Sequence, residues 1–187
     1  MVDLAIPALR HMDRESYSVF RRNLDAMIAA DDSVTLFEYL LTRMLRRHLD
    51  RFFNNAKPPP VRFRGMRPVL GDIAVLLSAL AHLGNRDPEK KQRAFEEGVR
   101  ELMVNRDDPA LEKPGSPGVM EVDAALERLE QTEMSLRRQV LLACGQTVMS
   151  DGMVAEGEAQ LLRAIADALD CPVPPFVRDS AQPSDES

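Results

Sequence analysis

The feature that most constrains this chain is an internal repeat, because one helix-turn-helix pattern occurs twice at a spacing of 120 residues. The segment ADDSVTLFEYLLTRMLRRHLD, which ends at Asp50, aligns with SDGMVAEGEAQLLRAIADALD, which ends at Asp170. Both copies contain Asp-x-x-Val-x-x-x-Glu, followed by apolar residues at helical spacing. The match includes the turn as well as the helix, so we expect a domain organised around two such units.

The composition favours helices packed on helices. Hydrophobic residues make up 44% of the 187 residues, but aromatic residues make up only 5% and Trp is absent. Leu, Ala, Val and Met must therefore fill the interior, which suits an all-α bundle. We predict about seven helices in one domain over residues 1–176, with a first repeat at 13–53, an insert at 54–120, a second repeat at 133–170, and a disordered polar tail at 177–187.

Capping residues and apolar spacing define the expected helices. Asp13 and Asp87 are predicted caps, the second followed by Pro at the first helical position, and Thr35 with Glu38 forms a capping box. The KPPP run after Asn54 and the segment from Asn105 to Gly118 predict irregular connections. The expected helices cover approximately 13–30, 35–53, 69–83, 87–103, 121–130, 133–149 and 155–169.

The apolar segments and cysteines favour a cytosolic protein. The longest nearly apolar run, from Ile73 to Leu83, is well short of the roughly 20 residues that span a bilayer. The first residues do not have the pattern of a secretory signal. Cys144 and Cys171 have neither metal-ligand spacing nor a disulfide framework around them, which indicates two reduced thiols.

The two acidic turns are the candidate ligand site. Carboxylates converging on adjacent turns could bind calcium, magnesium or zinc through oxygen atoms, and the candidate residues are Asp31, Asp32, Glu38, Asp151 and Glu158. The alternative is helix capping. Thr35 and Glu38 fit a capping box, whereas the second copy has Ala155 in place of the hydroxyl, so capping explains Glu38 better than Glu158.

Basic residues concentrate between Arg43 and Arg67. Eight basic residues against Asp50 give this stretch a charge of +7, whereas 12 basic and 22 acidic residues from Pro68 onward give −10. The run could be a solvated helix face followed by a loop, or a patch for another protein or an anionic membrane surface. Nucleic acid is not expected, because the chain is acidic and has no recognised binding motif. The arginines of the predicted patch are Arg43, Arg46, Arg47, Arg51, Arg62, Arg64 and Arg67.

Catalytic motifs are missing from the sequence. His11, His48 and His82 stand apart from one another, and no HExxH, phosphate-binding glycine loop or GxSxG occurs. We therefore expect a chain that is not itself an enzyme and that requires no cofactor, apart from the possible divalent cation. The oligomeric state is left open.

At DGMVAEGEAQLLRAIADALDCPVPP the chain resembles the TerB-like family, named for the tellurite-resistance protein TerB, whose helical bundles carry a DGxVxxxE turn in each half. The first copy, DDSVTLFE, has Asp32 in place of the glycine. Over roughly Asp3 to Phe176 the chain more specifically resembles the C-terminal region of bacterial membrane zinc metallopeptidases of the HtpX-like type.

This resemblance implies a larger parent protein with a membrane-embedded HExxH domain, to which the chain would be the cytosolic tail. It implies that the chain is tethered to the inner membrane by an N-terminal region that this sequence does not contain. For function it implies a regulatory or protein-interaction domain that engages the parent peptidase or another protein, with a cation-binding stress sensor as the alternative.

Overall fold

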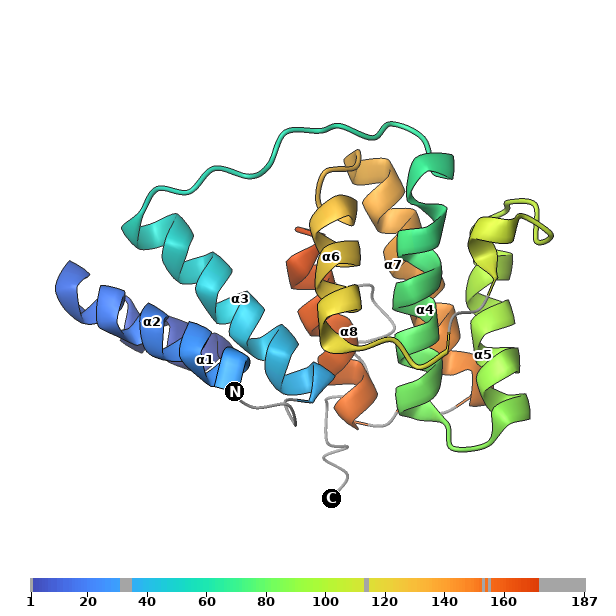
Figure 1. Ribbon diagram of the computed structural model, residues 1–187, viewed down its shortest axis with the longest axis horizontal. Helices are drawn as coiled ribbons and strands as arrows, with labels where there is room; N and C mark the ends of the chain where they lie inside the picture. The colour runs from blue at the N-terminus through green and yellow to red at the C-terminus, as the bar shows by residue number, and fades with distance from the viewer. Residues whose placement is uncertain (1, 31–34, 113–114, 153, 155, 172–187) are drawn as a thin grey trace, which may run out of the picture. The chain divides into compact units, whose positions relative to one another are not determined.

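The computed structural model describes residues 2–30, 35–112, 115–152, 154 and 156–171, and throughout these residues the regular structure is helical (Figure 1). This confirms the predicted all-α fold class. Compared with the predicted seven helices, the described residues contain eight α-helices and three 3-10 turns. The additional helix is α1, Val2–Leu9, which has no counterpart among the predicted helices. Pro7 lies inside it, and an internal proline normally counts against a helix.

The chain divides into two compact units, Met1–Pro59 and Pro60–Ser187. The boundary falls in the KPPP run, inside the predicted insert, where the sequence analysis placed no domain boundary. Three successive prolines lack backbone N–H groups, so they cannot continue the preceding helix. Residues 57–62 have no regular secondary structure. The prediction of one domain over 1–176 stays a prediction, and each unit is described by itself.

The first unit consists of α1, α2 (Arg14–Ala30) and α3 (Leu36–Phe53). Asp13 begins α2 as predicted, because its Oδ1 accepts a hydrogen bond from the Ser16 amide at 2.7 Å. That hydrogen bond lowers the pKa of Asp13. Tyr17 on α2 stacks on Phe53 of α3, with ring centroids 4.4 Å apart. These two buried rings and Leu49 form the centre of a small apolar core.

A polar cluster lies beside this core. Asp50 accepts hydrogen bonds from the Tyr17 hydroxyl at 2.7 Å and from Arg21 Nη1 at 2.8 Å. Burial, together with this bond to an ionised acceptor, raises the pKa of Tyr17 well above its usual value. Asp50 therefore joins α3 to α2 through two side chains of the neighbouring helix.

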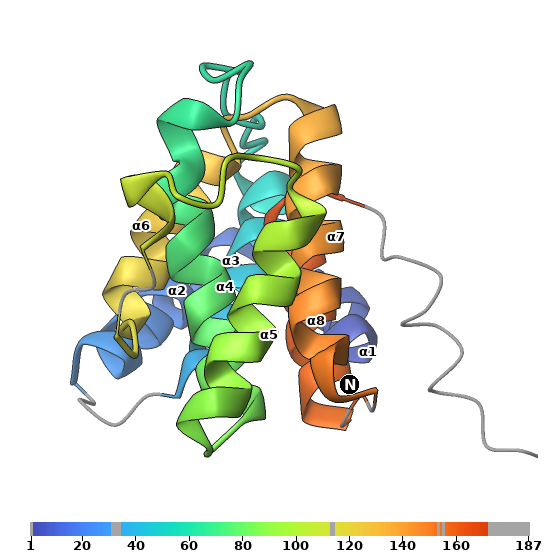
Figure 2. The ribbon, with the colours of Figure 1, turned by 90° about the vertical axis from the view of Figure 1, so that its right-hand side faces the viewer.

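The second unit is built around α4, Leu70–Gly84. The 3-10 turn η1 (Arg67–Val69) precedes it, and α4 contacts each of the other α-helices of the unit: α5 (Pro88–Glu101), α6 (Val119–Leu129), α7 (Met134–Val148) and α8 (Glu156–Ala168). In Figure 2, α4 runs between α6 and the pair formed by α5 and α7. Two further 3-10 turns, η2 (Pro109–Leu111) and η3 (Met149–Asp151), precede α6 and α8.

The central position of α4 explains its composition. The stretch Arg67–Gly84 has a mean hydropathy of 1.3 and, by length and composition alone, is the one candidate membrane span among the described residues. Most of its apolar side chains are buried among the other helices, including Ile73, Leu76 and Leu77 at 0% exposure. A buried core helix satisfies the same hydropathy criterion, and packing within this unit accounts for the apolar run.

The chain enters the second unit through an anchored extended segment. Arg62 and Phe63 donate backbone hydrogen bonds to the carbonyl of Gln131, and Glu133 donates one back to the carbonyl of Phe63. The Arg128 guanidinium lies 4.8 Å from the centre of the Phe63 ring and pairs with Asp72 at 2.8 Å. Part of the predicted irregular insert is thus fixed against the turn between α6 and α7.

Candidate functional site

Glu38 takes part in a helix cap. Its carboxylate accepts hydrogen bonds from the Thr35 amide at 2.9 Å and the Thr35 hydroxyl at 2.8 Å, while Thr35 Oγ1 accepts the Glu38 amide. This is the predicted capping box at the start of α3. Asp31 and Asp32, the other acidic candidates of this turn, lie outside the described residues.

The second acidic turn belongs to the second unit. Asp151 ends η3 and is exposed, and the following Gly152 has a φ of 79°, a left-handed conformation that suits glycine. Glu158 lies in the first turn of α8, as predicted. A Cβ atom added to Gly84 would overlap Glu158 Oε1, so the Glu158 carboxylate packs against the end of α4.

The structure therefore places Glu38 in one unit and Asp151 with Glu158 in the other. Among the described residues, His, Cys, Asp and Glu side chains form no group of three or more that could hold a metal ion. The predicted five-residue cation site includes Asp31 and Asp32, which lie outside the described residues, so this site stays a prediction.

The predicted basic patch is also divided between the units. Arg43, Arg46, Arg47 and Arg51 lie on α3, and Arg43 among them is buried. Arg62, Arg64 and Arg67 belong to the second unit and are exposed. Carboxylates accompany some of these arginines, since Arg46 pairs with Asp25 at 3.4 Å and Arg64 with Glu133 at 3.6 Å. These pairs fit the interpretation as a solvated, charge-balanced face, and the patch for a partner stays a prediction.

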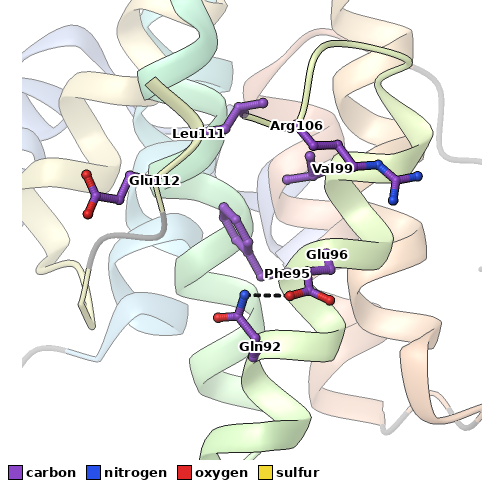
Figure 3. A pocket seen from close by; sticks show the side chains of 7 residues that line it. All are labelled: Gln92, Phe95, Glu96, Val99, Arg106, Leu111 and Glu112. Atoms are coloured by element: carbon purple, nitrogen blue, oxygen red, sulfur yellow. Dashed lines mark hydrogen bonds between the residues drawn. The ribbon is translucent and has the colours of Figure 1, made fainter. Parts of the chain in front are cut away.

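A cleft that no motif in the sequence indicated lies on the second unit. It opens between α5 and the segment around η2, has a volume of about 320 Å³, and is shown in Figure 3. Such a volume is near the lower end of ordinary ligand pockets, which measure roughly 300–1,000 Å³. We call it the α5 cleft. Its lining residues are Gln92, Phe95, Glu96, Val99, Arg106, Leu111 and Glu112.

The lining residues separate into an apolar floor and a polar rim. Phe95 and Val99 project from α5 and Leu111 from the opposite wall (Figure 3), and each is only 4% exposed. The rim residues are all exposed and consist of Gln92, Glu96, Arg106 and Glu112. Apolar surface with a few polar groups around it is the common composition of a binding site.

Local turn chemistry shapes the wall opposite α5. The Asp107 amide donates to Asn105 Oδ1 at 3.2 Å, and Asp108 caps η2 by accepting the Ala110 amide at 3.0 Å. Asn and Asp commonly stabilise turns in this way. Further along, the carbonyl of Gly115 accepts a hydrogen bond from buried Ser78 on α4 at 3.1 Å. The part of this wall from Asn105 to Ala110 is therefore held by hydrogen bonds of its own side chains.

The rim carries charges of both signs. Glu96 Oε1 accepts a hydrogen bond from Gln92 Nε2 at 2.7 Å, one turn away on α5. Among the described residues, no carboxylate pairs with Arg106, whereas Arg100 pairs with Glu97 and Arg128 with Asp72. The cleft thus presents a positioned carboxylate and a guanidinium without a carboxylate partner.

One signal in the sequence could have pointed to this cleft. The stretch Asn105–Gly118 was predicted as a loop of 14 residues, and loops of that length in compact domains are often functional. The floor could not be identified in the same way. Phe95 and Val99 belong to the apolar stripe of α5, and a stripe alone does not show which of its residues border open space.

The two cysteines are free and buried, in agreement with the predicted reduced thiols. Burial raises the pKa of Cys144 to about 12. Cys171 Sγ lies 3.7 Å from Met134 Sδ.

We compared the chain with models of protein families, with curated proteins and with solved structures, and none of the three comparisons found a match. The resemblance to TerB-like domains therefore stays a prediction.

Proposed function

We propose that this chain is a protein-interaction module whose α5 cleft receives an apolar side chain of a partner segment. The observation that carries the proposal is the floor of Phe95, Val99 and Leu111, which borders an open volume of about 320 Å³. An apolar side chain placed there would leave water and contact all three residues. The exposed polar rim would remain available to the backbone and flanking residues of the partner.

The charge around the cleft suggests the composition of the partner. From Asp87 to Glu112 the sequence has eight acidic and five basic residues, which gives a net charge of −3. Complementary charge speeds association and disfavours wrong partners. The proposed partner segment therefore combines an apolar anchor with at least one basic residue.

The expected affinity is modest. Burying one Leu or Phe side chain contributes about 1.5–3 kcal/mol, and a Kd of 1 mM corresponds to about −4.1 kcal/mol. One or two rim contacts add about 0.5–1.5 kcal/mol each, and association itself costs free energy, so a short segment should bind with a Kd of about 1 mM or weaker. Such binding suits a regulatory contact that becomes effective when both partners are held close together.

The family resemblance supplies a context for this proposal. In a membrane zinc metallopeptidase, the module would be the non-catalytic cytosolic tail, tethered to the inner membrane, and the partner segment would belong to the parent peptidase domain or to a protein that it engages. This context is supported by the sequence resemblance alone.

The proposal can be tested with blocked tripeptides, acetyl-Gly-X-Gly-amide with X as Leu, Phe or Ser, titrated into the methyl-labelled chain and followed by NMR. We expect the Leu and Phe peptides, but not the Ser peptide, to shift the methyl resonances of Val99 and Leu111. The substitution Val99→Phe should fill the cleft and abolish the shift of the Leu111 methyl resonances, which remain observable in this variant.

The matched control is Leu142→Phe on α7, because Leu142 is 40% exposed and does not line the cleft. Circular dichroism would verify that both variants fold. Shifts that persist unchanged in folded Val99→Phe, or no shifts with any apolar peptide up to several times the expected Kd, would rule the proposal out.

A further inference from the structure

Arg106 is the rim residue whose chemistry the proposed apolar anchor does not use. It is exposed and is one of the lining residues of the α5 cleft; in Figure 3 its side chain passes Val99, and the guanidinium lies at the outer edge, on the side away from Leu111. No carboxylate of the described part of the chain pairs with it, although other arginines of the same unit have such partners. The planar guanidinium is suited to bind a carboxylate through two parallel hydrogen bonds.

The backbone around Arg106 is held in place. Asn105 accepts the Asp107 amide through its side chain, and its carbonyl accepts the Asp108 amide at 3.3 Å. Arg106 is therefore an inner residue of a hydrogen-bonded turn that closely follows α5. Asp108, two residues further along the chain, uses its carboxylate to cap η2.

The other charged group of the rim lies on α5 itself. Gln92 donates to Glu96 at 2.7 Å and thereby fixes the direction of that carboxylate. Glu112 adds a second negative charge on the opposite wall. An occupant that satisfies this rim needs an anionic group for Arg106, a cationic group for the two glutamates, and an apolar group between them for the floor.

From this arrangement, and resting on the proposed function, we infer that the α5 cleft recognises a polypeptide C-terminus whose last residue is apolar. The terminal carboxylate binds Arg106, the last side chain occupies the floor of Phe95, Val99 and Leu111, and a basic residue upstream lies near Glu96. A C-terminal residue carries its carboxylate and its side chain on the same Cα atom. An internal segment would bring an apolar side chain but no carboxylate at that position.

The test uses two forms of one peptide, acetyl-Gly-Lys-Ala-Leu with a free C-terminal carboxylate and the same peptide with a C-terminal amide. Both are titrated into the full chain and followed by NMR. An ion pair at an exposed arginine contributes up to about a fivefold change in affinity, so we expect the free acid to bind about fivefold more tightly than the amide. The substitution Arg106→Gln should remove this preference by weakening the free acid, so that acid and amide then bind this variant equally.

Arg93→Gln is the matched control, because Arg93 is also exposed on α5 but does not line the cleft. It should retain the preference for the free acid. Equal affinities of acid and amide, both lost in Val99→Phe, would overturn the C-terminal recognition and leave the proposed function standing. If neither peptide binds the wild-type chain and the blocked tripeptides give no response, the proposed function and the C-terminal recognition are both overturned.

Free leucine provides a third measurement, because it carries the same carboxylate and side chain. We expect it to bind more weakly than the peptide acid, since its ammonium group replaces the peptide backbone and the basic residue. Equal affinity of leucine and the peptide would identify the ligand as a free amino acid and overturn the inference of a polypeptide C-terminus.

Discussion

Replacing Gly98 by alanine should destabilise the second unit, although alanine is normally the better residue inside a helix. Gly98 lies on α5 where this helix packs against α7. A Cβ atom at this position would overlap Thr147 Oγ1 and would lie 3.1 Å from the carbonyl oxygen of Ala143 and 3.2 Å from Leu77 Cδ1. The backbone oxygen cannot move without the helix, so α5 has to shift away from α7.

The magnitude follows from two opposing contributions. Replacing glycine by alanine in a helix interior raises the stability by about 1 kcal/mol through helix propensity. Overpacking a close contact lowers the stability by about 1–3 kcal/mol. With three tight contacts we take the upper value, which leaves a net loss of about 2 kcal/mol. For a unit of this size each kcal/mol lowers Tm by about 4 °C, so we expect a decrease of about 8 °C in thermal denaturation followed by circular dichroism.

Two further variants make this prediction specific. A Cβ atom added to Gly71 on α4 would have no neighbouring atoms within 4 Å, so Gly71→Ala should raise the stability by about 0.5–1 kcal/mol. Adding Thr147→Ala to Gly98→Ala removes the overlapping hydroxyl and should recover about half of the loss, a coupling measurable in a double-mutant cycle. An unchanged or increased Tm for Gly98→Ala would show that the contact between α5 and α7 does not require glycine.

Three other predictions concern the caps and buried groups. Thr35→Ala removes the hydroxyl of the capping box and should lower the free energy of unfolding by about 1 kcal/mol, measured by urea denaturation. Serine keeps the hydroxyl, so a loss of stability in Thr35→Ser equal to that in Thr35→Ala would argue against the cap. The pKa of Tyr17 is raised in the folded chain. Its contribution to stability should therefore be fully present below its unfolded pKa of about 10 and should decline as the pH rises above that value. Denaturation measured from about pH 8 to 11 should show this decline in the wild type and a smaller decline in Tyr17→Phe. The pKa of the fully buried Cys144 is raised to about 12, so this thiol should resist a thiol reagent at about pH 8 until the chain unfolds. The variant Cys171→Ser leaves Cys144 as the one cysteine of the chain, and prompt labelling of this variant in its native state would contradict the prediction.

Helix positions were predictable because their signals are local. Asp13, Thr35 and Asp87 cap helices in the structure as their sequence positions indicated. Each acts through a side-chain oxygen that accepts an amide two or three residues away. Such a bond depends only on the neighbouring sequence, so it could be identified without knowledge of the tertiary structure. The missed α1 shows the limit of this approach, since this helix forms although it contains Pro7, a residue that normally counts against a helix.

The candidate sites were less predictable because they depend on which segments meet in space. The acidic repeat correctly marked Glu38 and Glu158 as residues of the first helical turn. It did not reveal that Glu158 packs against Gly84, which lies more than 70 residues away in the chain. The α5 cleft was missed for the same reason, because Leu111 and Phe95 face one open volume only after α5 and η2 are placed on α4.

Local sequence signals were sufficient for the all-helical class, the caps and the approximate helix limits, because helical periodicity and capping are properties of short segments. The grouping of these helices into two units, the apolar residues that border a cleft and the charged groups that share its rim emerged only from the folded chain. Burial and charge pairing depend on distances between segments remote in sequence. Arg106 illustrates the difference: its charge is evident from the sequence, but its position beside an apolar floor follows only from the packing of η2 and α5 against α4.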